Sequence, residues 1–458
     1  MSLIRSAKNA VTPGGRHGVS RRESRDAIGH AVSALNTFAQ SNLIDRLGMR
    51  KTSEQAVYQA TKSGFKAAGA AGRTFSRSGS GEKQGARVPG APKKGVFDLT
   101  PTEDEQSLVE VVADFATEAL RPAAAEANET CEAPDEILRS SLEMGLPILG
   151  VPEDLGGIFG ERSAMGATLV HEALAKGDMG LALAVLAPGA VSTAISLWGT
   201  EEQQQTYLPA FTGDAVPSAA LALSEPTVLF DPLKPGTKAT RDGSGYVLSG
   251  VKSAVVRGAT AELFIVGAEL EGKPALFIVE SSAEGVRVEA DPSMGVRAAG
   301  LTRLHLTGVR VGSESLLGET DGTTYVEAVR LARLGWCALA IGTGQAVLDY
   351  VTDYVKTREA FGEPISHRQA VAFMVANIAI ELQGMRLVTY RAASRAARGE
   401  DFAREVALAR RICTDKGMQI GLDGVQLLGG HGFVKEHPVE RWYRDLRAVG
   451  VMEGGVLV

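Results

Sequence analysis

Two short segments in the C-terminal third combine residue types that suit a phosphate-containing cofactor. Arg358 ends a long helical pattern just before Phe361 and Gly362, so a permanent cation stands at a turn where a pyrophosphate could take a bidentate contact. The alternative is an arginine at a helix C-terminus that the helix dipole stabilises. Further along, Gly429 and Gly430 lack side chains, which lets backbone N–H groups approach a dinucleotide. The alternative for this glycine pair is a simple helix cap.

The signatures of other common chemistries are missing from the sequence. It holds no serine-centred elbow, HExxH motif, Walker loop or spaced set of Cys and His. Cys131, Cys337 and Cys413 are far apart, so we expect buried, inert thiols and no metal site. The GTGQAV stretch at 342–347 lies inside a helical pattern and follows no strand, which favours close helix packing over a Rossmann-type dinucleotide loop.

Length and charge divide the chain into unlike parts. At 458 residues we expect two or three folded units, and 44% apolar with 22% charged residues is a globular composition. Residues 1–95 hold 17 Lys and Arg against 5 Asp and Glu, a net +12, and residues 96–458 hold 31 against 49, a net −18. An acidic body repels a nucleic-acid backbone, so no nucleic-acid partner is expected.

The first part of the body reads as helices. Thr102 and Glu105 form a capping box that opens a helix, and Pro122 is expected to mark its end. The uncharged run 179–200 is interrupted by Pro188 and Gly189, so we expect two pieces that are too short to span a membrane and that form buried helices.

Beyond Pro217 the pattern changes to short β-branched segments separated by turns, such as GYVLSGVKSAVV and PALFIVES, as in an antiparallel sheet or small barrel. Three long helical patterns then follow, one to Gly362, one over 368–399 and one over 402–429, which predict an antiparallel bundle. The fold class is therefore α+β and mostly α. The expected parts are a basic extension at 1–96, a helical domain at 97–217, a β domain at 218–323 and a helical bundle at 324–458.

Three C-terminal segments, occurring in order, resemble the acyl-CoA dehydrogenase family. They are TREAFGEPISHRQAVAFMVANIAIEL, VQLLGGHGFVKEHPVERWYRDLR and VMEGG, and GTEEQQQTYLP, ALSEP and DGSGYVLSGVK match the family's order earlier in the chain. The resemblance covers about residues 97–458. It implies a helical domain, a β domain and a helical bundle, in agreement with the order predicted above.

The resemblance implies FAD as the cofactor and a homodimer or homotetramer, in which Arg358 and the Gly-Gly segment would complete the FAD site of a neighbouring subunit. The implied FAD contacts are Ser224, Arg358, Phe361, Gln369, Gln426, Gly429 and Gly430. Arg333 would hold the CoA or thioester end of an acyl-CoA substrate. For Gln369 the alternative is an ordinary surface glutamine, and for Arg333 a solvated helix cation.

Glu453 is the implied catalytic base, because the family's late Glu-Gly removes the α-proton of the thioester while the β-hydrogen leaves as hydride to flavin N5. Burial in an apolar acyl pocket would raise the pKa of this carboxyl toward the working pH. Taken alone, a glutamate so near the end of a chain is more often a solvated terminal residue. Some relatives place the base just before the arginine that corresponds to Arg333, where this chain has Ala332.

The sequence departs from the family around the flavin and the thioester. Residues 227–231 are Thr-Val-Leu-Phe-Asp, where the family usually has a run of small residues. Residues 254–256 are Ala-Val-Val, where the family has Trp-Ile-Thr. Arg330 replaces an acidic residue, Gly455 stands where a threonine often contacts FAD, and the usual final helix is missing. Two functions remain. One is an acyl-CoA dehydrogenase that passes electrons to an electron-transferring flavoprotein. The other is a degenerate member acting in acyl-CoA binding or assembly.

The basic extension has the features of a membrane tether. Residues 27–44 contain no Lys, Arg, Asp or Glu, and their apolar residues fall near helical spacing, whereas residues 75–95 have linker composition. A transit peptide and a disordered tail without a partner are the alternatives. We expect a cytoplasmic, membrane-associated protein, with the mitochondrial matrix as the alternative location.

The tether hypothesis predicts that the full chain sediments with anionic liposomes at low salt, whereas a chain that begins at Val96 does not and keeps its oligomeric state. Each basic residue near an anionic surface contributes about 1 kcal/mol and is screened by salt, so binding should fall steeply as salt is added. Equal sedimentation of the two proteins, or none by either, would remove the hypothesis.

Overall fold

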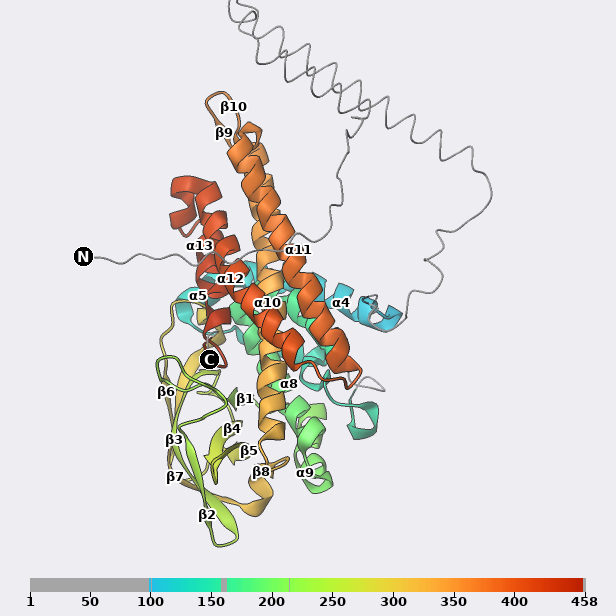
Figure 1. The fold of residues 1–458 in the computed structure, drawn as a ribbon, viewed down its shortest axis with the longest axis vertical. Coiled ribbons are helices and arrows are strands. Elements are labelled where there is room, and N and C mark those ends of the chain that lie inside the picture. The colour runs from blue at the N-terminus through green and yellow to red at the C-terminus, as the bar shows by residue number, and fades with distance from the viewer. Residues whose placement is uncertain (1–98, 100, 158–162, 214, 456–458) are drawn as a thin grey trace, which may run out of the picture. The chain divides into compact units, whose positions relative to one another are not determined.

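The structure is a computed structural model that describes residues 99, 101–157, 163–213 and 215–455. All of them belong to one compact unit, residues 95–458. The predicted basic extension, with its apolar stretch at 27–44 and its linker at 75–95, lies outside the described residues. The described part runs from helices to strands and back to helices (Figure 1), which confirms the predicted fold class.

The first layer is helical, and it comprises α4 (Glu103–Phe115), α5 (Arg121–Thr130), α6 (Asp135–Glu143), α7 (Ala164–Gly177), α8 (Met179–Trp198) and α9 (Glu201–Thr212). The capping box is present, since Thr102 and Glu105 bond each other's backbone N–H groups. The expectation that Pro122 ends this helix is wrong. A π-helical turn, Ala116–Leu120, leads directly into α5, and Pro122 lies in the first turn of α5, where its missing N–H costs little.

The predicted interruption of the run 179–200 is also wrong, because α8 continues through Pro188. Packing outweighs the local cost of the proline, since most of the helix is buried in the core, as predicted. By length and composition alone, three helices are apolar enough to cross a membrane: α8, α10 (Thr323–Thr357) and α11 (Gln369–Ala397). Their most apolar windows are 61%, 67% and 17% buried in the protein, so α11 is the one that exposes its apolar residues.

The β domain forms a sheet with the strand order β6-β7-β3-β2-β4-β5-β8, and β1 pairs with β4. Its strands are β1 (Ala219–Ala222), β2 (Lys238–Asp242), β3 (Gly245–Val256), β4 (Leu263–Leu270), β5 (Lys273–Glu280), β6 (Val286–Ala290), β7 (Leu301–Gly312) and β8 (Leu316–Leu317). Most pairs are antiparallel, as expected, whereas β4 pairs in parallel with both β1 and β2. The loop after β1 carries Ser224 toward the helical bundle.

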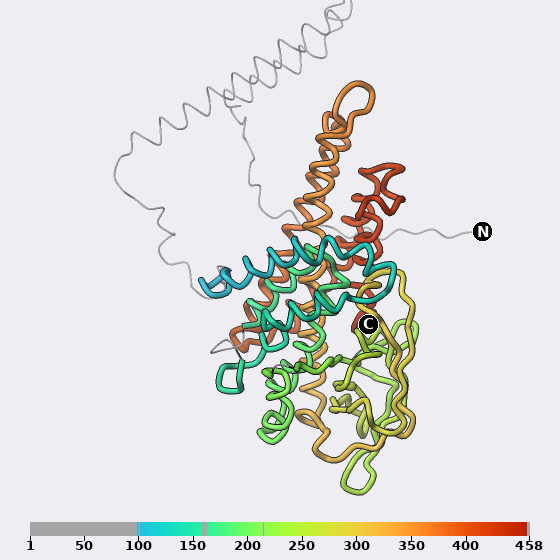
Figure 2. Tube along the Cα trace, turned by 180° about the vertical axis from the view of Figure 1, so that it is seen from behind, coloured from blue at the N-terminus to red at the C-terminus, as the bar shows by residue number. Residues whose placement is uncertain are grey.

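Three long helices follow: α10 (Thr323–Thr357), α11 (Gln369–Ala397) and α12 (Ala403–Leu428). The first is shorter than predicted at its end, because a hairpin of β9 (Glu359–Ala360) and β10 (Glu363–Pro364) occupies the residues before Gly362 and after it. Phe361 and Gly362 both have left-handed backbones that reverse the chain there. The N-terminal helices lie on one side of α10, and α11 and α12 lie on the other (Figures 1 and 2).

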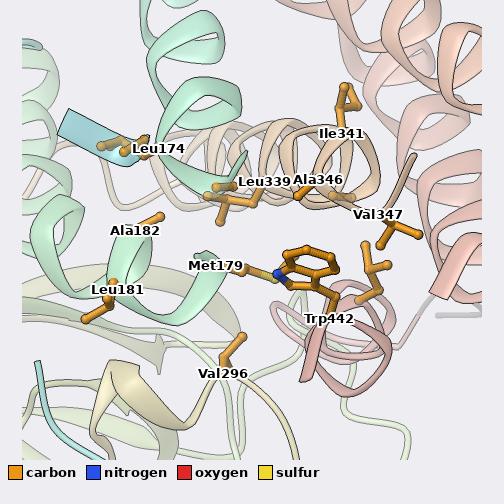
Figure 3. Close-up of a cluster of buried hydrophobic side chains, with 14 of the residues drawn as sticks. Leu174, Met179, Leu181, Ala182, Val296, Leu339, Ile341, Ala346, Val347 and Trp442 are labelled. Carbon is orange, nitrogen blue, oxygen red and sulfur yellow. The ribbon is translucent and has the colours of Figure 1, made fainter. Parts of the chain in front are cut away.

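Small residues bring α7 close to α10, as predicted for the stretch 342–347. A Cβ added at Gly342 would lie 2.1 Å from the Glu172 carbonyl oxygen, so only glycine fits there. The large core that these helices share also holds Trp442 of the short helix α13 (Val439–Leu446), which lies beside Met179 of α8 (Figure 3).

Buried polar contacts fix α13 in place. Arg441 Nε donates to Asp178 Oδ2 at 3.0 Å, and Asp445 Oδ1 accepts the backbone N–H of Val296 at 2.6 Å. Removing one partner of such a pair leaves a buried charge or donor without a partner, which is strongly destabilising. The anchored helix delivers the last described residues, up to Gly455, to the space between the bundle and the β domain.

Candidate active site

Glu453 lies on a tight turn after α13, and its backbone is held on both sides. Its φ of +50° places a non-glycine residue in the left-handed region, a costly conformation that surrounding contacts must enforce. The N–H of Glu453 donates to Ser224 Oγ at 3.1 Å. Its carbonyl oxygen accepts from Arg333, from Nε at 3.1 Å and from Nη2 at 2.8 Å. The β1 loop and α10 therefore meet at this one residue.

The carbonyls on either side of Glu453 are held from α12. Arg410 Nη2 donates to the carbonyl oxygen of Met452 and, at 2.8 Å, to that of Gly454. Three consecutive carbonyls thus accept from two arginines, which we call the arginine clamp (Arg333 and Arg410). The Arg410 side chain is almost wholly buried, with the residue 3% exposed.

The carboxyl of Glu453 has the properties of a base for neutral pH. Burial raises its pKa to about 7, and the charges of Arg410 and Arg333 and a hydrogen bond from the Trp336 side chain keep the pKa from rising further. Its Oε2 atom is buried and has no hydrogen-bond partner in the part of the chain that the structure describes. An oxygen without a partner and with this proton affinity suits proton abstraction.

A buried ion pair supports the loop that holds Ser224. Lys252 Nζ lies 2.7 Å from Glu225 Oε1, and both residues are buried. The Glu225 carboxylate also accepts the N–H groups of Gly236 and Thr237, at 2.7 and 2.9 Å. Burial lowers the pKa of Lys252 to about 8, and the Glu225 carboxylate opposes this shift. Glu225 thus fixes the loop that carries Ser224 to the backbone of Gly236 and Thr237 and to the Lys252 side chain.

The departure at residues 227–231 lies directly on this segment. The carbonyl oxygen of Phe230 accepts the N–H of Gly455 at 3.3 Å, and a Cβ added at Gly454 would lie 2.3 Å from Pro232 Cδ. The side chains of Val228 and Leu229 are exposed beside it, at 90% and 68%. The altered run therefore covers the backbone of the Glu453 segment and also presents apolar surface to solvent.

The other predicted cofactor residues gather at the far end of the helical bundle. Arg358 and Phe361 follow α10, Gln369 begins α11, and Gln426 lies at the end of α12, next to Gly429 and Gly430; all six are exposed. Tyr354 near the end of α10 hydrogen-bonds to His431, 2.9 Å from its hydroxyl to Nδ1, so the structure brings the end of α10 close to the glycine pair.

This far cluster fits an anionic, extended ligand. A Cβ added at Gly429 or Gly430 would meet nothing within 4 Å, and Gly429 has a left-handed φ of +59°. Within the described residues, the Arg358 guanidinium has no hydrogen bond or ion pair, so its charge is available to a ligand. Open backbone, a free cation and two exposed amides are the groups that a dinucleotide would use.

The two groups of residues are too far apart to hold one cofactor within a single chain. Arg333 and Arg358 lie on the same helix up to its C-terminal cap, 25 positions apart, which at 1.5 Å per residue is roughly 37 Å. A dinucleotide is considerably shorter. Ser224 and Arg333 therefore join Glu453, whereas the other predicted FAD contacts form a separate cluster, and the individual roles of all these residues stay predictions.

Sequence reasoning missed four residues that shape the surroundings of Glu453. Glu225 and Lys252 were visible inside the ALSEP and DGSGYVLSGVK segments but carried no assigned role. Trp336 and Arg410 lie within helical patterns, with nothing around them in the sequence to set them apart from other helix residues.

The comparisons with known proteins identify the family. Models of the acyl-CoA dehydrogenase N-terminal, middle and C-terminal domains match residues 102–214, 220–309 and 321–455. The short-chain specific acyl-CoA dehydrogenase of Bos taurus is 32% identical over 367 residues, which cover 77% of this chain and 87% of that protein. The 3-(aryl)acrylate reductase of Clostridium sporogenes is 30% identical over 363 residues, covering 77% and 95%.

Solved structures agree with this result. Butyryl-CoA dehydrogenase from Megasphaera elsdenii superposes with a TM-score of 0.73 at 27% identity, covering 79% of this chain and 97% of that one. The chain belongs to the acyl-CoA dehydrogenase family, which confirms the sequence-based assignment of the class of enzyme. Family membership also supports FAD as the cofactor.

Glu453→Gln should change how stability depends on pH. An unfolded glutamate ionises near its usual pKa of 4.5, whereas the folded Glu453 stays protonated up to about 7. As the pH rises between these values, only the unfolded state loses its proton, so the wild type loses stability relative to the glutamine variant, by up to about 3 kcal/mol.

Urea unfolding of both proteins at pH 4.5 and pH 7.5 measures this difference. The variant should gain stability relative to the wild type at the higher pH. Glu436→Gln, at an exposed glutamate, is the control and should show no such gain. A stability difference between Glu453→Gln and the wild type that is the same at both pH values would show that the Glu453 carboxyl is solvated.

Proposed function

We propose that this protein oxidises an acyl-CoA thioester to the trans-2-enoyl-CoA, with Glu453 as the base that removes the α-proton. The observation that carries the proposal is the state of this carboxyl: buried, with a pKa raised to about 7 and one oxygen without a partner. A base with a pKa near the working pH is largely ionised there and still has a high proton affinity.

The residues around Glu453 have different roles in this proposal. Ser224 and the arginine clamp fix the backbone, so that the carboxyl is presented from one defined place. FAD, when bound, supplies the acceptor for the β-hydrogen, which leaves as hydride. Arg333, half-buried beside Glu453, is proposed to act also on the thioester end of the substrate, and its backbone contact holds it at the required position.

The cofactor is proposed to be shared between two copies of the chain. The cluster with Arg358, Gln369 and the glycine pair lies too far from Glu453 to serve the same cofactor within one subunit, so it would complete the site of a neighbour. Helix α11 offers a face for this association, because Phe373, Ile380 and Leu387 repeat every seven residues and are all largely exposed. A homodimer or homotetramer follows from this arrangement.

The remaining proposals concern partners and location. We propose an electron-transferring flavoprotein as the electron acceptor. A solved structure of the electron transferring flavoprotein of Acidaminococcus fermentans includes a chain that matches this one with a TM-score of 0.73 at 29% identity. The basic extension is proposed to tether the protein to anionic membranes in the cytoplasm, with the mitochondrial matrix as the alternative, and net charge is what supports this.

The second candidate function is a degenerate member that binds acyl-CoA or serves in assembly with little dehydrogenation. It is favoured by the altered flavin-side residues, among them the exposed Val228 and Leu229 and Ala254 in a left-handed conformation. The colour of the purified protein separates the two functions. A bound-flavin spectrum supports the enzyme, and protein that stays colourless after FAD is added supports the alternative.

Glu453→Gln should retain flavin and abolish its reduction by acyl-CoA, because glutamine keeps the volume of the side chain and cannot accept the proton. Loss of a general base costs about 100- to 10,000-fold in rate. Anaerobic stopped-flow reduction by butyryl-CoA measures the effect. Reduction at the wild-type rate would mean that another group is the base.

Arg358→Ala should weaken FAD retention far more than it changes the melting temperature of the flavin-free protein. The exposed guanidinium has no partner within the described residues, so its removal costs the apoprotein little, whereas a charged contact to a pyrophosphate would be lost. Flavin content after extensive dialysis is the measurement. Lys356→Ala, at an exposed cation on the last turn of α10, is the control and should keep its flavin. Equal flavin content in the two variants would assign Arg358 a structural role.

A further inference from the structure

Arg410 is a buried cation that the mechanism above does not use for substrate or cofactor. It lies on α12, where it is 3% exposed, and burial lowers its pKa. Burying an arginine is costly unless hydrogen bonds and opposite charge compensate for the lost hydration. Its Nη2 donates to two carbonyls, whereas Nε and Nη1 have no hydrogen-bond partner within the described part of the chain.

The opposite charge that acts most strongly on Arg410 is that of Glu453, which raises the Arg410 pKa against the effect of burial. In return, Arg410 is the charge that most strongly favours the ionised form of Glu453. The other groups that act on Arg410 are the like charge of Arg333 and the two thiols of Cys337 and Cys413. Among the described residues, Glu453 is the carboxylate that acts most strongly on this arginine.

The hydrogen bonds of Arg410 go to the backbone on both sides of Glu453. One nitrogen bridges the carbonyl oxygens of Met452 and Gly454, so it spans the residue between them. That residue, Glu453, has the left-handed backbone that its side chain disfavours. Arg333 and Ser224 hydrogen-bond to Glu453 itself, and Arg410 hydrogen-bonds to the residues on either side of it.

We propose that Arg410 is a positioning residue for the base Glu453: its guanidinium bridges the two carbonyls that flank Glu453 and thereby locks the turn from which the carboxyl is presented. The inference rests on the proposed function in that it assigns Glu453 as the base. The proposal adds a residue of α12 to the site. It also gives a reason why α12 carries a buried charge that contacts Met452 and Gly454.

Two substitutions test the proposal in the flavin-loaded protein. Arg410→Lys keeps the charge and can still donate to both carbonyls, whereas Arg410→Met keeps much of the length and removes charge and donors. With butyryl-CoA, Arg410→Met should reduce the rate of anaerobic flavin reduction at pH 7 by about 100-fold, the cost of a base displaced by about 1 Å. Binding of butyryl-CoA, followed by its change to the flavin spectrum, should stay unchanged.

The pH profile distinguishes positioning from a general loss of structure. Removal of the cation disfavours the carboxylate, so the acid limb of the rate profile should move upward by about one pH unit in Arg410→Met and should return toward the wild-type position in Arg410→Lys. Arg411→Met, at an exposed neighbour paired with Asp415, is the control and should leave rate and profile unchanged. A wild-type rate and profile in Arg410→Met would overturn the proposal.

A double-mutant cycle on stability judges Arg410 without turnover. The pH at which the stability gain of Glu453→Gln over Glu453 stops growing is set by the folded-state pKa, so this upper limit should rise by about one unit when Arg410 is methionine, and Arg411→Met should not move it. If wild-type protein is not reduced by acyl-CoA but this shift is present, the proposed function fails while the link between Arg410 and Glu453 stands. If the shift is absent, the inference about Arg410 fails whatever the activity.

Discussion

Two arginines from different helices donate to three consecutive backbone carbonyls, and the rest of the site depends on that contact. A buried guanidinium is tolerated only where acceptors and a negative charge compensate for its lost hydration. Met452, Glu453 and Gly454 supply the acceptors, and the Glu453 carboxyl supplies the charge. Neither the arginines nor the glutamate would be stable in this place alone. The mutual dependence explains how a base with a pKa near neutral is held inside the protein.

The same contact requires that the chain be delivered to the bundle in a fixed register. Helix α13 does this, because Trp442 fills the core beside Met179 (Figure 3) and Arg441 pairs with Asp178 at the start of α8. On the other side, the Glu225–Lys252 pair holds the loop that carries Ser224. Buried ion pairs thus secure both approaches to Glu453. A shift of α13 would reach Glu453 along the chain that follows the helix, and a shift of the loop would reach it through the hydrogen bond from the Glu453 N–H to Ser224 Oγ.

Local signals predicted the parts of the fold that local forces determine. The Thr102–Glu105 capping box and the close packing at Gly342 need only neighbouring residues or the absence of a side chain. Pro122 and Pro188 misled, because a π-helical turn and a buried core outweigh the preference of a single proline. The environment of Glu453 had no local signal, since Ser224 and Arg333 are 229 and 120 residues away in sequence. The family resemblance, and not the spacing of residues, pointed to Glu453.

The length of α10 has a consequence for how the site is assembled. This continuous helix carries Arg333 in the Glu453 site and ends at the turn that holds Arg358, roughly 37 Å away at 1.5 Å per residue. Helix α10 packs on α7, α11 and α12, and a packed helix cannot shorten. Arg333 and Arg358 therefore stay apart in every conformation that keeps the core. The Glu453 site and the Arg358 cluster therefore lie at two well-separated places along one rigid helix. Two copies of the chain placed with these two places together would satisfy the chemistry of both, and the exposed apolar face of α11 lies along the same helix.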